Sequence, residues 1–120
     1  MGILQVRPKL APGEEVRWKA YANRVLSGAS TAGGRLFVTD RRVFFQPNRV
    51  DAVLGRKVWE SSLEGVTTVE TVGRDGLVFA GGTRKRLGIK TAEGEEVFVV
   101  NRLKKKEAEL LRLFPQASQG

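Results

Sequence analysis

Residues 35–46 read Arg35-Leu-Phe-Val-Thr-Asp-Arg-Arg-Val-Phe-Phe-Gln46. Two runs of β-branched and aromatic residues flank the short polar stretch Asp40-Arg-Arg42, and this pattern is typical of a β-hairpin. Pro47 ends the second strand, because proline has no N–H group to donate to a strand ladder. The stretch therefore predicts a mainly β protein.

Signals on both sides of this hairpin predict more short elements. Alternating apolar residues predict a strand over residues 16–22, followed by a flexible, glycine-rich connection over residues 28–34. An asparagine and a glycine bracket apolar residues at helical spacing, which predicts one or two helical turns over residues 48–55. Apolar runs between turn residues predict five further strands, at 57–60, 66–72, 77–80, 86–91 and 95–100.

The last predicted element is a helix over residues 102–114, capped by Asn101 and ended by Pro115. Leu103, Leu110 and Phe114 coincide on one side of this helix, so that stripe is expected to be buried. About seven short strands and one amphipathic helix predict a bent β-sandwich or partly open barrel, closed by the C-terminal helix. The predicted organisation is a lead-in at 1–13, one domain at 14–114 and a disordered tail at 115–120.

The composition argues against an enzyme. The 120 residues contain neither cysteine nor histidine, which removes the common ligands of transition metals and the usual base of a catalytic triad. We therefore expect no catalytic residues, no metal and no cofactor. No apolar run is long enough to span a membrane, and the N-terminus does not resemble a signal peptide. A soluble, cytoplasmic protein is expected, with peripheral membrane association left open.

Charge is unevenly distributed along the chain, whose net charge is +8. Residues 1–57 carry eleven basic against four acidic residues, whereas residues 58–83 carry one basic against four acidic residues. Such asymmetry indicates a basic face and an acidic edge, and hence an anionic partner. The alternative is a basic surface that only keeps the protein soluble.

Three short motifs resemble the GRAM domain, a member of the pleckstrin-homology (PH) superfold. They are Leu10-Ala-Pro-Gly-Glu-Glu-Val16, Gly34-Arg-Leu-Phe-Val-Thr-Asp-Arg-Arg-Val-Phe-Phe45 and Leu63-Glu-Gly-Val-Thr-Thr-Val69. The resemblance covers residues 10–114, and Phe45-Gln-Pro-Asn-Arg49 and Trp59-Glu60 are similar to bacterial members. It implies a bent β-sandwich closed by a C-terminal helix, a lipid- or protein-binding module, and a turn and sheet role for Arg41 and Arg42.

The main candidate for an anion-binding patch combines one strand with the start of the last helix. Residues 84, 86 and 90 share parity, so they are expected to project from one face of a strand. The helix begins with three lysines that should emerge near the same strand. The predicted site comprises Arg84, Lys85, Arg86, Lys90, Lys104, Lys105 and Lys106. A merely solvated outer face is the alternative.

The GRAM and PH resemblance implies a second possible site. A typical PH phosphoinositide site has a basic residue late in the first strand and Arg/Lys-x-Arg early in the second. Lys19, Arg24 and Arg35 fill this pattern only in part, because Phe37 stands at the second basic position of the second strand. Solvated strand charges are again the alternative.

The sequence thus predicts a non-catalytic binding module for a protein partner or an anionic membrane surface, and it does not constrain the oligomeric state. The alternative is a small basic β-barrel that binds nucleic acid. Single-strand binders need exposed aromatic side chains for stacking, whereas the aromatic residues here fall mainly in strand interiors, at Phe37, Phe44, Phe45 and Phe98.

Overall fold

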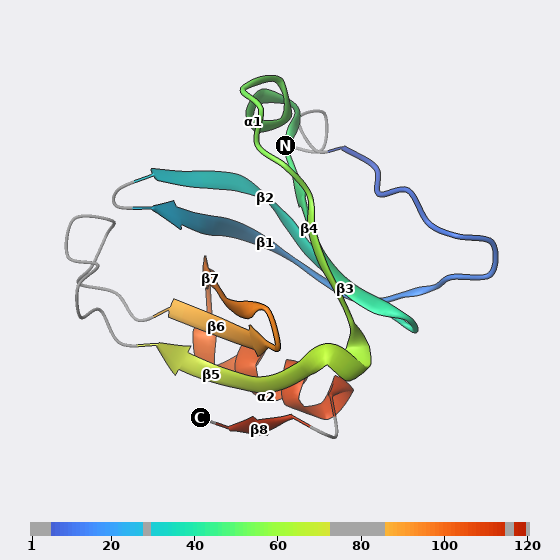
Figure 1. The fold of residues 1–120 in the computed structure, drawn as a ribbon, viewed down its shortest axis with the longest axis vertical. Helices are drawn as coiled ribbons and strands as arrows, with labels where there is room; N and C mark the ends of the chain where they lie inside the picture. Colours follow the sequence, from blue (N-terminus) through green and yellow to red (C-terminus); the bar gives the residue numbers. More distant parts are fainter. Residues whose placement is uncertain (1–5, 28–29, 73–85, 115–116, 120) are drawn as a thin grey trace.

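The computed structural model describes residues 6–27, 30–72, 86–114 and 117–119, which fold around one bent sheet (Figure 1). Its strands lie in the order β4-β3-β2-β1-β7-β6-β5-β8. The neighbouring strands are antiparallel except β5 and β8, which are parallel. The strands are β1 (Val16–Ser27), β2 (Ser30–Thr39), β3 (Arg42–Pro47), β4 (Trp59–Ser62), β5 (Val66–Val72), β6 (Arg86–Thr91), β7 (Gly94–Val99) and β8 (Ser118–Gln119).

The sheet bends because β1 changes partners along its length. Its residues pair with β2 from Val16 onward, and Asn23 and Arg24 also pair with Val99 and Phe98 of β7. Strands β1–β4 therefore form one layer and β5–β7 the other (Figure 1). The sheet remains open, with β4 at one edge and β8 at the other.

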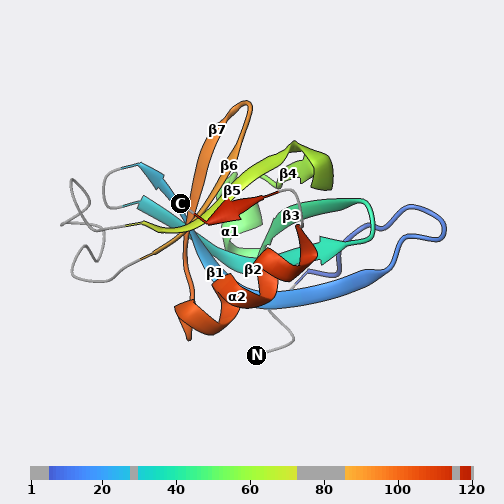
Figure 2. The same cartoon turned by 90° about the horizontal axis from the view of Figure 1, so that it is seen from below.

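Two α-helices and a short 3-10 helix, η2 (Leu63–Gly65), complete the fold of the described residues. The short α1 (Arg49–Val53) follows β3, and α2 (Leu103–Leu113) packs against β5 and β6. In Figure 2, which looks at the molecule from below, α2 lies in front of the strands. The predicted fold class, mainly β with a C-terminal helix covering a bent sheet, is confirmed. No helix of the described residues is long and apolar enough to cross a membrane.

The core lies between the two layers and α2. Leu36, Phe45 and Phe98 are buried in it, together with Leu110 and Phe114 from the end of the chain. The predicted helical stripe is thus confirmed at Leu110 and Phe114, whereas Leu103 is only partly buried at the edge of the core. Nε1 of Trp18 donates to Oε1 of Glu109 at 2.9 Å, which ties β1 to α2.

The predicted end of β1 and the predicted start of β2 are wrong. β1 continues to Ser27 and β2 begins at Ser30, so most of the expected flexible connection is strand. Gly34 pairs with Pro47, and a Cβ atom at Gly34 would lie 2.2 Å from the backbone oxygen of Gln46. Glycine is needed at this position because two backbones approach closely, not because the chain must bend.

The ends of α2 also differ from the prediction. Arg102, not Asn101, occupies the N-cap position, in a left-handed conformation (φ 53°) and without a side-chain cap. Within the expected tail, Ala117 packs against the core and β8 pairs with β5. The strand expected at 57–60 begins at Trp59, and the strand expected at 77–80 lies outside the described residues.

Candidate functional site

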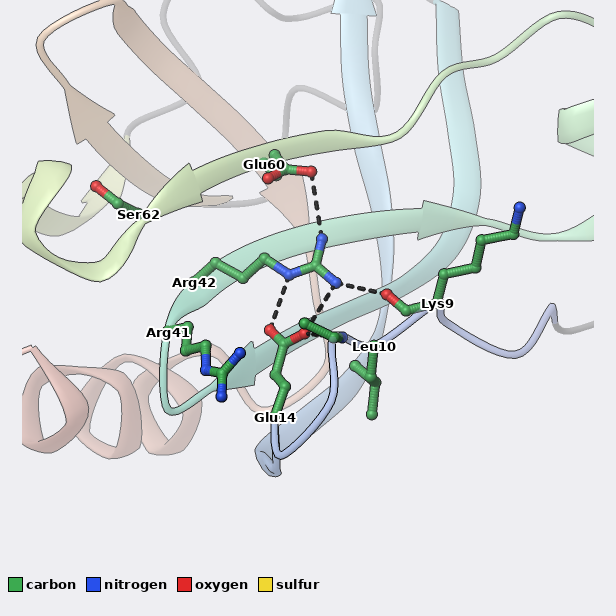
Figure 3. Close-up of a pocket in the computed structure, with 8 residues that line it drawn as sticks. Lys9, Leu10, Glu14, Arg41, Arg42, Glu60 and Ser62 are labelled. Carbon is green, nitrogen blue, oxygen red and sulfur yellow. Dashed lines mark hydrogen bonds and ion pairs between the residues drawn. The ribbon is translucent and has the colours of Figure 1, made fainter.

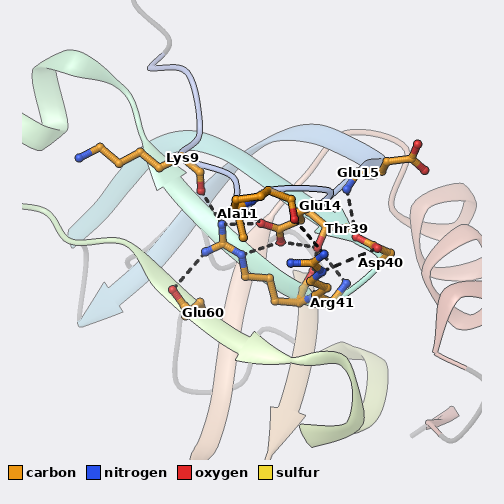
Figure 4. Close-up of polar contacts among 10 residues, drawn as sticks. Lys9, Ala11, Glu14, Glu15, Thr39, Asp40, Arg41 and Glu60 are labelled. Atoms are coloured by element: carbon orange, nitrogen blue, oxygen red, sulfur yellow. Dashed lines mark hydrogen bonds and ion pairs between the residues drawn. The ribbon is translucent and has the colours of Figure 1, made fainter.

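Two of the three GRAM-like motifs meet in an ion-pair network around the buried carboxylate of Glu14, on the outer face of β2 and β3 (Figure 4). The Glu14 carboxylate accepts hydrogen bonds from Oγ1 of Thr39 at 2.7 Å, Nε of Arg42 at 2.9 Å and the backbone N–H of Ala11 at 2.9 Å. The Arg42 guanidinium, its strongest partner, lowers the pKa of Glu14 to about 2. Arg42 also pairs with Glu60 at 3.2 Å.

This network surrounds a hollow of about 520 Å³, but it leaves little charge free for a ligand (Figure 3). Both terminal nitrogens and Nε of Arg42 donate to Glu14, to Glu60 or to the carbonyl of Lys9. Arg41 donates to the carbonyl of Pro12 at 3.0 Å. Arg41 and Arg42 therefore hold turn and sheet together, as the resemblance implies, and the hollow is a structural feature.

Next to this network, a column of stacked side chains covers the outer face. The guanidinium of Arg42 lies 4.2 Å from the ring centroid of Phe44, Phe44 stacks on Phe37 at 5.0 Å, and Arg35 lies 5.0 Å above Phe37. A terminal nitrogen of Arg35 also donates to the carbonyl of Val6 at 3.1 Å. Phe37, at the second basic position of the PH-type pattern, is thus a buried packing residue.

Three hollows are linked to one another through shared lining residues. Lys19, Tyr21 and Arg35 line the first, of about 190 Å³. Tyr21 also lines the second, of about 260 Å³, together with Asn101. Asn101 in turn lines the third, of about 390 Å³, at the start of α2. We call this surface the cationic face; it comprises Lys19, Tyr21, Arg35, Asn101, Arg102, Lys105 and Lys106.

Positive charges crowd together at the α2 end of the cationic face. The pKa of Lys106 is lowered by burial and by the neighbouring charges of Arg102 and Lys105. These charges lie at a helix N-terminus, where the helix dipole is also positive. Because like charges repel each other, an anion bound here would relieve an unfavourable arrangement.

The structure divides the predicted patch. Arg86 is fully buried, so its assignment as a partner-binding residue is wrong. The parity argument fails because residues 86–89 are all buried, which means that both faces of β6 are covered there. Lys90 is exposed, but it lies opposite Glu95 in the β6–β7 strand register, next to the turn. This is the end of β6 that is far from the start of α2.

The remaining residues of the patch fall into two groups. Lys104 and Lys105 are exposed at the start of α2, and Lys106 is partly exposed, so this part of the predicted patch is available to a partner. Arg84 and Lys85 lie outside the described residues. The sequence predicted one patch formed by the β6 strand and the start of α2. The prediction is wrong for Lys90, whose Nζ lies 3.5 Å from the carboxylate of Glu70.

The alternative PH-type set is also divided. Lys19 and Arg35 line the same hollow, but Arg24 lies on the side of β1 that carries Ala20 and Ala22, which are buried. Arg24 is paired with Glu96, with Nε 2.8 Å from Oε1. Tyr21 and Arg102 were missed, although Tyr21 shares the parity of Lys19 and could have been placed on the same face.

No protein-family model matches the chain, and no curated protein matches it in sequence. Two solved structures are similar, each with a TM-score of 0.62. The C-terminal domain of an unknown protein from Leishmania infantum is 15% identical, with 87% of each chain covered. The hSac2 domain of the human phosphoinositide phosphatase Sac2 is 11% identical, over 92% of this chain and 80% of that domain.

At these identities the similarity concerns the fold. The hSac2 domain has a PH-like fold, and the seven antiparallel strands and the helix α2 of the described residues fit such a fold. What the chain shares with these two domains is therefore the fold, a bent antiparallel sheet followed by a helix.

Proposed function

We propose that this chain is a non-catalytic, cytoplasmic binding module of the GRAM type, similar to bacterial members, whose cationic face binds an anionic membrane surface or an anionic protein partner. The observation that supports this proposal best is the linked series of hollows, which has cations at both ends. Lys19 and Arg35 at one end and Lys105 at the other line a connected series of hollows. The GRAM assignment itself rests on the three sequence motifs.

Lys19, Arg102 and Lys105 of this face are exposed, whereas Arg35 donates to the carbonyl of Val6 and Nζ of Lys106 donates to the carbonyl of Asn101. In the described part of the chain, the salt bridges involve other cations, namely Arg24, Arg41, Arg42, Arg56 and Lys90. Glu109 lines the hollow at the start of α2, but its Oε1 atom accepts the Trp18 hydrogen bond. A surface whose cations form none of these salt bridges favours an anionic partner.

The exposed aromatic content favours this function over nucleic-acid binding. Among the described aromatic residues, Tyr21 is the one whose side chain is largely exposed, whereas Phe37, Phe44, Phe45 and Phe98 are buried. Non-specific binding of single strands relies on several aromatic side chains on which successive bases stack. One tyrosine among cations fits a charged surface better.

Vesicle binding of a charge variant tests the proposal. Lys19→Gln/Lys105→Gln removes one exposed charge from each end of the cationic face, and Lys9→Gln/Lys90→Gln removes two exposed charges elsewhere. With vesicles that contain phosphatidylserine, or with an acidic polypeptide, we expect a loss of affinity of roughly tenfold or more for the first variant, steeper at low salt. The second variant should bind like the parent.

Chemical-shift titrations separate the two function classes. Anionic lipid head groups should shift the resonances of Tyr21, Asn101 and Arg102, whereas single-stranded DNA should shift them less at equal salt concentration. Equal affinity of the two double variants for every anion would contradict the proposed face. Tight binding of single-stranded DNA with a saturating shift of Tyr21 would favour the nucleic-acid alternative.

A further inference from the structure

The short helix α1 exposes its apolar side to solvent. Val50, Val53 and Leu54 follow the i, i+3, i+4 spacing of one helical stripe, and a surface helix normally buries such a stripe against the core. Here these side chains are 54%, 85% and 62% exposed. No residue of α1 is buried, and Val58, which follows it, is 46% exposed.

Hydrogen bonds on the polar side of α1 fix this orientation. Oδ1 of Asn48 accepts from the backbone N–H of Asp51 at 2.9 Å, and Oδ2 of Asp51 accepts from the backbone N–H of Gly33 at 3.0 Å. The N–H of Asn48 donates to the carbonyl of Gly33 at 2.9 Å. Because the polar side is bound to β2, the aliphatic stripe must face away from the protein.

The position of α1 gives the stripe access to a large flat partner. We call residues 48–58 the α1 knob. It lies at one end of the longest axis of the molecule, at the top of Figure 1. Asn48 lines the same hollow as Tyr21 and Asn101, so the α1 knob adjoins the cationic face.

The charges of the α1 knob complement an anionic surface. Arg49 and Lys57 are exposed beside the stripe. The acidic residue of the knob, Asp51, is only 18% exposed at its side chain and lies 3.9 Å from Nε of Arg56. An aliphatic tip with basic flanks is the pattern of segments that enter the headgroup region of a bilayer.

We propose that the α1 knob inserts Val50, Val53 and Leu54 into the interface of a bilayer that contains anionic lipids. This inference rests on the proposed function and narrows the partner of the cationic face to a lipid surface. A protein interface of ordinary stability buries more than about 1,000 Å², which four aliphatic side chains on a projecting knob do not supply. A bilayer needs no such area, because a few inserted side chains act together with cations that bind lipid phosphates.

Two matched double variants test the insertion. Val53→Ser/Leu54→Ser removes the tip of the stripe, and Leu10→Ser/Val16→Ser removes one leucine and one valine that are 41% and 37% exposed elsewhere. Each is mixed with phosphatidylcholine vesicles with and without phosphatidylserine, and sedimented. We expect the first variant to lose roughly tenfold or more in affinity for the anionic vesicles. The control variant should bind like the parent, and neither should change binding of soluble inositol hexakisphosphate.

A fluorescent label provides a second measurement. The chain contains no cysteine, so Leu54→Cys and Leu10→Cys each offer one site for an environment-sensitive dye. Emission from position 54 should shift to the blue when anionic vesicles are added, and emission from position 10 should not. Because both positions are exposed, the melting temperature should stay close to that of the parent.

The outcomes separate this inference from the proposed function. If Val53→Ser/Leu54→Ser binds anionic vesicles like the parent and the label at position 54 does not shift, insertion is wrong while the cationic face stands. If that variant loses binding but Lys19→Gln/Lys105→Gln does not, insertion stands and the cationic face is wrong. If the parent protein does not bind anionic vesicles, the insertion is wrong. Binding of the acidic polypeptide then decides whether the cationic face binds anions.

Discussion

Glu14 and Arg42 form an ion pair that fastens the lead-in segment to β3, with Nε of Arg42 2.9 Å from Oε2 of Glu14. The Glu14 side chain is 1% exposed, and Thr39 and Ala11 also donate to its carboxylate. Arg42 and Arg35 in turn donate to the carbonyls of Lys9 and Val6. The lead-in is therefore held against the outer face by the same residues that resemble the GRAM motifs.

Replacing Glu14 should destabilise the fold. Glu14→Gln removes the negative charge opposite Arg42, although Arg42 keeps Glu60 as a partner. We expect the free energy of unfolding to fall by about 2–3 kcal/mol, as measured in urea titrations. Glu15→Gln is the matched control, because Glu15 is exposed; a similar loss in both variants would contradict a special role for Glu14.

The same carboxylate should set part of the acid sensitivity. The pKa of Glu14 is lowered from 4.5 to about 2 by its hydrogen bond with Arg42. Its contribution to stability is therefore complete above about pH 4.5 and is lost as the pH falls through about 2. Urea titrations between these values should show stability falling with pH in the parent and less steeply in Glu14→Gln. Parallel curves would contradict the pair.

The packing of α2 gives a direct test of its core contact. Leu110 is fully buried, so Leu110→Ala should lower the free energy of unfolding by about 2–4 kcal/mol. Leu103, only partly buried in the same helix, provides the comparison. Leu103→Ala should cost clearly less; an equal cost would mean that the start of α2 is packed as tightly as its end.

Gly34 should tolerate no side chain, although it lies in a strand. A Cβ atom would lie 2.2 Å from the carbonyl oxygen of Gln46 and 2.8 Å from Cα of Pro47, and both are backbone atoms. Gly34→Ala should therefore cost about 1–3 kcal/mol in unfolding experiments. Gly33→Ala should cost less, because its nearest contacts, at 3.1 Å, are side-chain atoms of Asn23 and Asn48. The reverse order would contradict this account.

The sequence predicted the elements whose signals are local. The hairpin around residues 40–42, the strand over residues 66–72 and the helix with Leu110 and Phe114 follow from spacing and turn residues alone. Gly34 was misassigned because a glycine can indicate either flexibility or the close approach of two backbones. The second case depends on Pro47, a residue from another strand.

The candidate site was harder to predict because it is assembled by distant contacts. The alternation of side chains along a strand placed Arg86 and Leu87 on opposite faces of β6. It could not show that both of these faces are covered. Tyr21 and Asn101 line one hollow only because β1 crosses from β2 to β7 at Asn23 and Arg24. The inverted orientation of α1 likewise depends on the hydrogen bond between Asp51 and Gly33.

A pair of carboxyl groups on β5 and β7 should make stability depend on pH near neutrality. The pKa of Glu95, an exposed residue, is raised to about 7, chiefly by its hydrogen bond with the carboxylate of Glu70 and then by partial desolvation. Lys90 lies between these strands, 3.5 Å from Glu70. Glu95 is thus protonated in the folded protein over a pH range in which it is ionised in the unfolded chain.

Because this pKa is raised on folding, the contribution of Glu95 to stability is complete below about pH 4.5 and is lost as the pH rises through about 7. Glu95→Gln keeps a hydrogen-bond donor toward Glu70 but cannot ionise. We expect the melting temperature of the parent to fall between pH 5 and pH 8 relative to that of the variant, most steeply around the pKa of about 7. Glu93→Gln, an exposed residue in the adjacent turn, should follow the parent. A constant difference between Glu95→Gln and the parent across this range would show that Glu95 and Glu70 share no proton.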